Sequence, residues 1–216
     1  MTIFKGTIIT CDNKNTVCQY LVEEKGRIAY VGDALPEKYS SGKITRLAKK
    51  ALMPSFADSH LHFSSYSLIS STLDVREAKD FASLSDILSH YVQRSAPKVV
   101  LGFGISAHSL VEQRMITRIE LDKMETRPVM LIKYDGHASV INTAMKEMLP
   151  PKIKTLRGYN GDTGQLFQEA FFAATDYITS KVSVIALIQH MLTAVDTMAS
   201  KGISLVHPAE GVGFIL

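Results

Sequence analysis

The pattern of apolar and polar positions changes in character near residue 50. Before that point, three short runs are rich in β-branched and aromatic residues, namely "TIFKGTIIT", "VCQYLVEE" and "GRIAYVG". Asp12-Asn13 and Gly26 separate these runs, and such residues favour turns between strands. We therefore predict a small antiparallel sheet over residues 2–33, followed by a polar loop over residues 34–48.

Beyond residue 50, apolar runs of strand length alternate with segments of helical character. The expected strands are residues 50–56 ("KALMPSF"), 98–104, 128–134 and 203–207. Between them, the periodicity predicts helices over residues 84–93, 118–124, 142–148, 167–174 and 182–201. This alternation is typical of βαβ units, in which a parallel sheet is covered on both faces.

Several local signals set the ends of these helices. Ser83 or Ser85 is the expected N-cap of the first helix, and Thr117 with Glu120 forms a capping box before the second. Gly202 is the expected stop of the last helix. Residues 149–166 contain two prolines and three glycines and are predicted to form a long loop, which in a compact domain often has a function.

Composition and charge exclude several classes of protein. The chain has 216 residues, 46% of them hydrophobic, so a sizeable folded core is expected. The net charge is +3 and the basic residues are scattered, so nucleic-acid binding is not expected. No apolar run approaches a membrane span, and the first residues lack the core of a signal peptide. Two cysteines, Cys11 and Cys18, favour reduced thiols, and we expect a soluble cytoplasmic protein without membrane or nucleic-acid partners.

The stretch "PSFADSHLHF" carries the most specific candidate chemistry. His60 and His62 are two residues apart on a predicted strand, so both imidazoles point to the same side. They lie at the strand's carboxyl end, where α/β folds place their active sites. Two imidazoles suit zinc or a similar divalent ion. Spacing alone leaves open whether they are metal ligands or two polar residues on an ordinary strand.

Three segments resemble one family of enzymes. "ALMPSFADSHLHF" resembles the first-strand signature of the amidohydrolase superfamily through Pro54, Phe56, Asp58, His60 and His62, with Ser55 where that family usually has glycine. "RPVMLIKYDGHASVINTAM" and "GDTGQLFQEA" resemble segments of its N-substituted formamide deformylase-like branch.

The resemblance implies a fold and a division of the chain. The family is built on a (β/α)8 barrel, which needs eight strands and about 250 residues. Four such strands are counted in this chain. The expected fold class is therefore α/β, with residues 1–49 forming part of a small β-sandwich and residues 50–216 forming the first half of a TIM-type barrel.

The resemblance also implies a reaction and a set of site residues. The expected reaction is hydrolysis of a carbon–nitrogen bond, of an amide or formamide type, by a metal-activated water. His60 and His62 would bind the divalent metal, zinc by expectation. The expected catalytic residues are Asp58, which would orient a histidine, together with Asp135 and His137. The expected substrate-binding residues are Glu169 and His207.

For most of these residues, a role unrelated to catalysis or binding remains open. Asp58 would otherwise cap a turn, Asp135 and His137 would lie in a solvated loop, and Glu169 would be an exposed helical residue. His207 would be a satisfied histidine near the core. His108 is a weaker candidate, whereas His90 and His190 lie in predicted helices and are expected to be structural or exposed.

The remaining metal ligands of the family, and its general-base aspartate, are not identifiable in the sequence. Three explanations of these missing residues remain open. The first is part of a longer enzyme, which alone would be inactive. The second is a non-catalytic binding or assembly protein derived from the same fold. The third is a homo-oligomer in which two copies complete each other's sheets. The expected partner in the complete enzyme is a small-molecule amide substrate.

Overall fold

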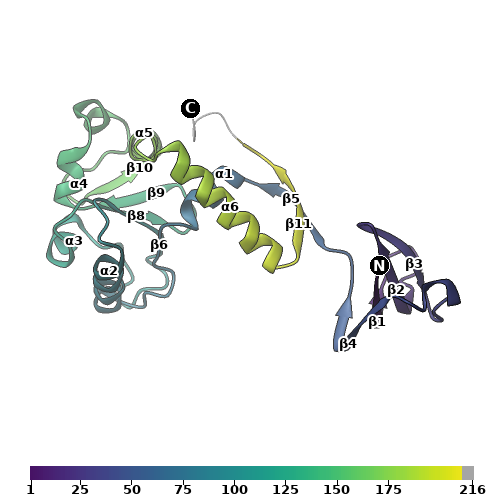
Figure 1. Ribbon diagram of the computed structural model, residues 1–216. Coiled ribbons are helices and arrows are strands. Elements are labelled where there is room, and N and C mark those ends of the chain that lie inside the picture. Colours follow the sequence, from purple (N-terminus) through teal and green to yellow (C-terminus); the bar gives the residue numbers. More distant parts are fainter. Residues whose placement is uncertain (211–216) are drawn as a thin grey trace. The chain divides into compact units, whose positions relative to one another are not determined.

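The computed structural model describes residues 1–210 (Figure 1). Its contacts divide the chain into two compact units. The first contains residues 1–57 and 202–205, and the second contains residues 58–201 and 206–210 of the described chain. The expected boundary of a sandwich and a barrel at residues 49 and 50 stays a prediction.

The first unit is built on a four-stranded sheet. Its strands are β1 (Thr2–Ile9), β2 (Val17–Glu24), β3 (Arg27–Gly32) and β4 (Lys43–Leu52), in the order β3-β2-β1-β4. The first three are antiparallel neighbours, as the sequence predicts, and β4 pairs with β1 in parallel. Ile3, Ile8 and Val22 form its buried apolar centre.

The loop predicted over residues 34–48 is wrong. It contains a short 3-10 helix, η1 (Glu37–Tyr39), and the first half of β4. The β4 segment is polar, and its residues Lys43 to Arg46 pair with Thr2 to Lys5 of β1. Main-chain pairing with a neighbouring strand, rather than side-chain hydrophobicity, therefore decides its conformation.

The second unit contains a five-stranded sheet covered by helices on both faces. Its helices are α1 (Phe63–Ile69), α2 (Phe81–Ser95), α3 (Arg118–Met124), α4 (Thr143–Met148), α5 (Gln168–Thr179) and α6 (Val184–Ser200), with the 3-10 helix η2 (Pro151–Thr155). The strands β6 (Leu73–Asp74), β7 (Val100–Ile105), β8 (Val129–Lys133), β9 (Ala138–Ile141) and β10 (Gln165–Phe167) follow the order β10-β9-β8-β7-β6.

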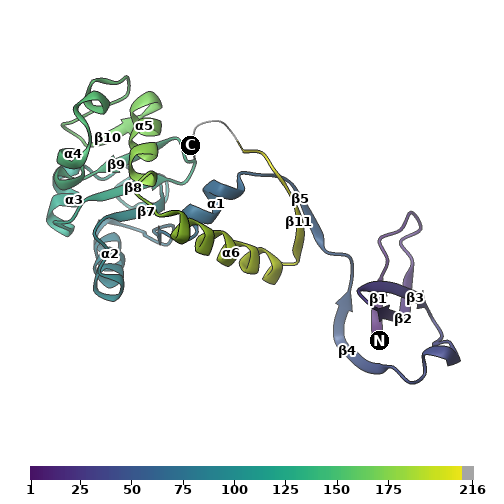
Figure 2. The same cartoon turned by 45° about the horizontal axis from the view of Figure 1, so that its top comes forward.

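Strand β8 shows how the sequence covers both faces. Val129 and Leu131 point into a core shared with α2 and α3, and Met130 and Ile132 point into a core shared with α4 and α5. Successive residues of a strand alternate between faces, so an unbroken apolar run fits a strand buried on both sides. Figure 2 shows α2 and α5 on opposite sides of this sheet.

The purely parallel sheet expected from the sequence is corrected. Strands β6, β7 and β8 are parallel neighbours, whereas β9 and β10 add to β8 in antiparallel fashion. Strands β6, β9 and β10 were not predicted, because strands of two to four residues carry little periodic signal. The chain is thus a mixed α/β protein, and its assignment to half of a closed barrel stays a prediction.

The strand predicted over residues 50–56 is divided in two. Strand β4 ends at Leu52, and β5 (Phe56–Leu61) begins after a break at the Pro54 segment. Proline has no N–H to donate, which favours such an interruption. Strand β5 pairs with β11 (Ile203–Pro208) in a separate two-stranded sheet, so these two strands do not join β7 and β8.

Asn142 links three elements of the second unit and is 1% exposed. Its Oδ1 accepts hydrogen bonds from the backbone N–H groups of Val129 (2.9 Å) and Met145 (3.0 Å). Its Nδ2 donates to the carbonyls of Glu125 (3.0 Å) and Arg127 (2.7 Å). One amide therefore starts α4, holds the start of β8 and fixes the segment after α3.

The helix starts are partly as expected. The capping box of Thr117 and Glu120 at α3 is confirmed. The predicted N-cap of α2 is wrong, because the helix begins at Phe81 and its N-cap is Asp80, whose carboxylate accepts from the N–H of Ser83. Ser83 completes that capping box from the third helical position, which explains why the sequence signal pointed to it.

The carboxylate of Glu120 makes stability sensitive to acid. The side-chain hydrogen bonds from Arg114 lower its pKa most; burial opposes them, and Thr117 adds further hydrogen bonds, so that the pKa falls from 4.5 to about 2. A depressed folded-state pKa contributes stability that is fully present above pH 4.5 and is lost as the pH falls toward 2.

We expect Glu120→Gln to remove about 1 kcal/mol of this acid-dependent stability, a value reduced for solvent screening of the partly exposed pair. Urea unfolding at several pH values between 2 and 6 measures it. Glu147→Gln, at an exposed position of α4, is the matched control. Equal pH slopes in the two variants would contradict the assignment.

Candidate metal site

His60 and His62 lie at the carboxyl end of β5, and both are exposed. Their ring centroids are 5.4 Å apart and the ring planes meet at 84°. Among residues 1–210, neither imidazole has a protein hydrogen-bond partner, so their nitrogens are available as ligands. The structure therefore brings the two predicted ligands together at the expected end of a strand.

Asp58 shapes the backbone of this strand end. Its Oδ1 accepts a hydrogen bond of 3.0 Å from the backbone N–H of His60. The contact is to the main chain rather than to an imidazole. It fixes the turn of the chain that carries His60, whereas the orientation of an imidazole by Asp58 stays a prediction.

The partner strand β11 brings a histidine and a carboxylate to the same strand pair. The N–H of Phe56 donates to Gly202 (2.8 Å) and that of Ala209 donates to Leu61 (2.9 Å), an order that makes β5 and β11 parallel. His207 lies near the carboxyl end of β11 and is exposed. The alternative that it is a buried histidine near the core is therefore wrong.

Glu210 is a residue that sequence reasoning missed. Its Oε1 accepts a hydrogen bond of 2.9 Å from the backbone N–H of Ser64, two residues after His62. The carboxylate thus joins the chain after β11 to the chain after β5. Its position three residues after His207, just past a strand end, was the available signal.

Asp135 and His137 lie in the turn between β8 and β9 and are both exposed. The backbone N–H of His137 donates to Asp135 Oδ1 (3.1 Å), and its Nδ1 lies 2.6 Å from the Asp135 carbonyl oxygen. Burial raises the pKa of Asp135, but the hydrogen bonds from His137 and from Lys133 outweigh it and lower that pKa overall. Asp135 is therefore held as a carboxylate at the carboxyl end of β8.

Glu169 lies in the first turn of α5 and is exposed. Its Oε1 is 3.4 Å from an Nη2 of Arg157, in an ion pair that is more than half exposed on both sides. This contact occupies the carboxylate with a neighbouring cation. A role in substrate binding stays a prediction.

The donor set fits a divalent metal only in part. Two unpartnered imidazoles are suitable ligands for zinc. Within residues 1–210, however, no group of three or more histidine, cysteine, aspartate or glutamate side chains is arranged to hold a metal ion. A catalytic zinc site usually has three protein ligands, so these residues supply a partial site.

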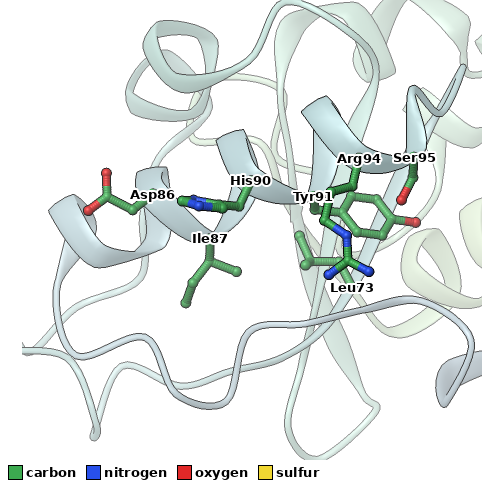
Figure 3. A pocket seen from close by; sticks show the side chains of 7 residues that line it. All are labelled: Leu73, Asp86, Ile87, His90, Tyr91, Arg94 and Ser95. Atoms are coloured by element: carbon green, nitrogen blue, oxygen red, sulfur yellow. The ribbon is translucent and has the colours of Figure 1, made fainter.

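A separate hollow of about 500 Å³ lies along α2 (Figure 3). It is lined by Leu73, Asp86, Ile87, His90, Tyr91, Arg94 and Ser95. None of the candidate ligands or catalytic residues belongs to this lining. His90 is exposed on α2, in line with the sequence expectation that it is structural or exposed, and the hollow does not include the candidate metal ligands.

Residues 47–211 match a sequence family described as the amidohydrolase family. The chain belongs to this family. The match covers most of the chain and includes all of the candidate site residues. The resemblance inferred from "PSFADSHLHF" is thereby confirmed.

Two curated proteins are similar in sequence to this amidohydrolase chain. One is the N-substituted formamide deformylase of Arthrobacter pascens, 25% identical over 171 residues, which cover 75% of this chain and 31% of that protein. The other is the exoenzymes regulatory protein AepA of Pectobacterium carotovorum subsp. carotovorum, 29% identical over 160 residues, which cover 66% of this chain and 33% of that protein.

Two crystal structures are similar in fold. They are uncharacterized metal-dependent hydrolases from Pyrococcus horikoshii OT3 and Pyrococcus furiosus, with TM-scores of 0.69 and 0.68 and 26% identity each. The similarity covers 95% of this chain but 42% and 43% of those proteins. The chain spans about a third of the length of the curated relatives and less than half of the solved ones.

Metal-dependent hydrolysis is the activity named for the two relatives of known structure, of which this chain covers less than half.

Proposed function

We propose that this chain carries the first two metal ligands of a metal-dependent hydrolase that acts on an amide- or formamide-type carbon–nitrogen bond. The observation that supports it most directly is the pair of adjacent, unpartnered imidazoles of His60 and His62 at the end of β5. The similarity to an N-substituted formamide deformylase favours the bond type. Zinc is the proposed metal, because imidazole nitrogen is among its preferred ligands.

The roles proposed for the other residues follow from their contacts. Asp58 holds the main chain of His60, and Glu210 holds the main chain that follows His62. Asp135 and His137 present a carboxylate and an imidazole beyond β8, where they would contact substrate or move a proton. His207 and Glu169 are the proposed substrate contacts.

The chemistry that a bound divalent ion supplies in such enzymes is a lowered pKa of a bound water, which becomes a hydroxide nucleophile near neutral pH. The chain's own contribution is to place two imidazoles side by side at one strand end. A catalytic site of this kind also needs a third metal ligand and a general base, and neither is identified among the residues described above. We therefore propose that the 216-residue chain alone has little hydrolase activity.

A second candidate function is a non-catalytic binding or assembly protein on the same fold. The partial donor set within residues 1–210 favours it, because two ligands hold a metal without completing a catalytic site.

Turnover measurements on the purified chain test the proposed lack of activity. With zinc added, we expect the chain not to hydrolyse a panel of N-substituted formamides and simple amides efficiently. Hydrolysis is measured by the release of amine and acid. Robust, zinc-dependent turnover that disappears in His60→Ala but persists in His90→Ala would show that the site is complete within the chain. That result would overturn the proposed inactivity while supporting the hydrolase.

A further inference from the structure

The chain on both sides of His62 is held by the two residues that follow β11. The backbone N–H of Ala209 donates to the carbonyl of Leu61 (2.9 Å), which belongs to the peptide group that leads into His62. The Oε1 of Glu210 accepts from the backbone N–H of Ser64 (2.9 Å), two residues after His62. Figures 1 and 2 show β11 beside β5. We call these two contacts the β11 clasp.

Helix α1 begins directly after His62 and has no cap of its own. His62 occupies the N-cap position, and its side chain makes no capping hydrogen bond. The first turn of α1 contains no acidic residue either. The first backbone N–H groups of a helix have no partner within the helix and need one from elsewhere. Glu210 supplies that partner to Ser64 from a segment 146 positions away.

The β11 clasp bears on metal binding through the backbone of His62. The φ of His62 is −80° and its ψ is 80°, values that lie between those of a strand and those of a helix. These dihedrals set the direction in which the imidazole leaves the chain. One contact of the clasp holds the peptide group before His62, and the other holds the chain after it. Without the second contact, His62 gains conformational freedom that metal binding would have to remove.

The contact made by Glu210 uses an acceptor oxygen rather than a charge. The side chain is exposed, and among residues 1–210 its carboxylate has no ion-pair partner. Its hydrogen bond goes to a neutral backbone N–H. Glutamine has the same length and carries a carbonyl oxygen at the same position, so it can accept the same bond. The pair of variants Glu210→Ala and Glu210→Gln therefore separates the loss of the contact from the loss of the charge.

We propose that Glu210 is a positioning residue for the metal ligand His62, and that closure of the β11 clasp and zinc binding favour one another. This role rests on the proposed function, in which His60 and His62 bind zinc. Such a coupling is reciprocal: the factor by which the contact raises zinc affinity is also the factor by which zinc favours the contact. Glu210 acts through the main chain and does not touch the metal.

Zinc titration in competition with a fluorescent chelator tests the effect on affinity. The contact is exposed to water, so we expect Glu210→Ala to lose about fivefold, less than the roughly 10–100-fold cost of removing a group that is bonded to the ligand itself. Glu210→Gln keeps the acceptor and should stay within about twofold of the wild type. The matched control, Glu147→Ala, removes the same side chain from an exposed position of α4 and should have wild-type affinity.

Two results of this titration would overturn the proposal. The first is equal zinc affinity in Glu210→Ala and the wild type. The second is an equal loss in Glu210→Ala and Glu210→Gln, because the effect would then come from the charge or from direct binding of the metal. Either result leaves the proposed function intact if His62→Ala loses zinc affinity. Unchanged affinity in His62→Ala would contradict both the proposed function and the role of Glu210.

Hydrogen exchange of single backbone amides, followed by nuclear magnetic resonance, separates a loosened clasp from a loosened fold. Without zinc, the amide of Ser64 should exchange faster in Glu210→Ala than in the wild type. The amide of Phe56, which donates to Gly202 (2.8 Å) in the same strand pair, should be unchanged. Equal acceleration at Ser64 and Phe56 would contradict a role confined to the clasp.

The same measurement with zinc tests the reciprocal effect. Saturating zinc should slow exchange at Ser64 in the wild type by up to about fivefold, the factor expected for the affinity, and should have no such effect in Glu210→Ala. Exchange at Ser64 that zinc leaves unchanged in the wild type, or slows equally in the two proteins, would overturn the coupling.

Discussion

Replacement of Asn142 by alanine is expected to destabilise the chain by about 3–5 kcal/mol, a large share of the stability of an ordinary domain. The variant removes four hydrogen bonds from a side chain that is 1% exposed. The backbone groups left behind, among them the N–H of Val129, stay buried without a partner. An unsatisfied buried group costs about 1–3 kcal/mol.

Urea unfolding followed by circular dichroism measures the effect. The matched control is Asn160→Ala, because Asn160 also accepts from two backbone N–H groups, those of Asp162 and Thr163, but is exposed. Water can replace the Asn160 contacts, so we expect a loss below about 1 kcal/mol there. A loss at Asn142 that is no larger than the loss at Asn160 would contradict the assignment.

The role of Asn142 also explains part of the family resemblance. The segment "RPVMLIKYDGHASVINTAM" ends around this asparagine, and the structure gives it a structural task. Gly164, in the segment "GDTGQLFQEA", also has a structural role. Its φ is +78°, and a Cβ at this position would lie 2.3 Å from the carbonyl oxygen of Ile141. Some residues of a functional signature are thus required by main-chain packing.

Local signals allowed much of the second unit to be predicted. The apolar runs at β7 and β8 are buried on both faces, and α6 (Val184–Ser200) lies close to the bounds predicted for it, residues 182–201. The capping box at Thr117 was readable because both partners lie within one helical turn. These features depend on residues close together in the sequence.

The missed features depend on distant or very short segments. Strand β4 is polar and forms only because β1 offers it a main-chain partner. Strands β9 and β10 are too short to show a period, and they pair in antiparallel fashion where the alternation predicted parallel neighbours. The contact of Glu210 with Ser64 joins residues 146 positions apart, which a single sequence does not reveal.

At the candidate site, too, the local features were predictable and the contacts between distant segments were not. The spacing of His60 and His62 was sufficient to predict that their side chains lie together. The contact made by Asp58 was not predictable in the same way. Its carboxylate accepts from the backbone N–H of His60, whereas the sequence led us to expect a contact with an imidazole ring. The separation of β5 and β11 from the larger sheet was also not predictable from local periodicity.

Loss of either histidine should reduce zinc affinity strongly. With only two imidazole ligands, the wild-type chain is expected to bind one zinc ion weakly and to lose it on dialysis. Removing a group that merely supports a ligand already costs 10–100-fold in metal affinity, so removing a ligand itself should cost at least about tenfold. Since His60 and His62 are exposed, alanine at either position should leave the free energy of unfolding nearly unchanged.

The most direct test is a zinc titration of the chain in competition with a fluorescent chelator. Wild type, His60→Ala, His62→Ala and the control His90→Ala, which alters an exposed histidine of α2, are compared at one pH. One weakly bound zinc ion is expected in the wild type and in His90→Ala, and at least a tenfold loss of zinc affinity is expected in both site variants. Equal zinc affinity in all four proteins would contradict the claim that His60 and His62 are the metal ligands of this amidohydrolase chain.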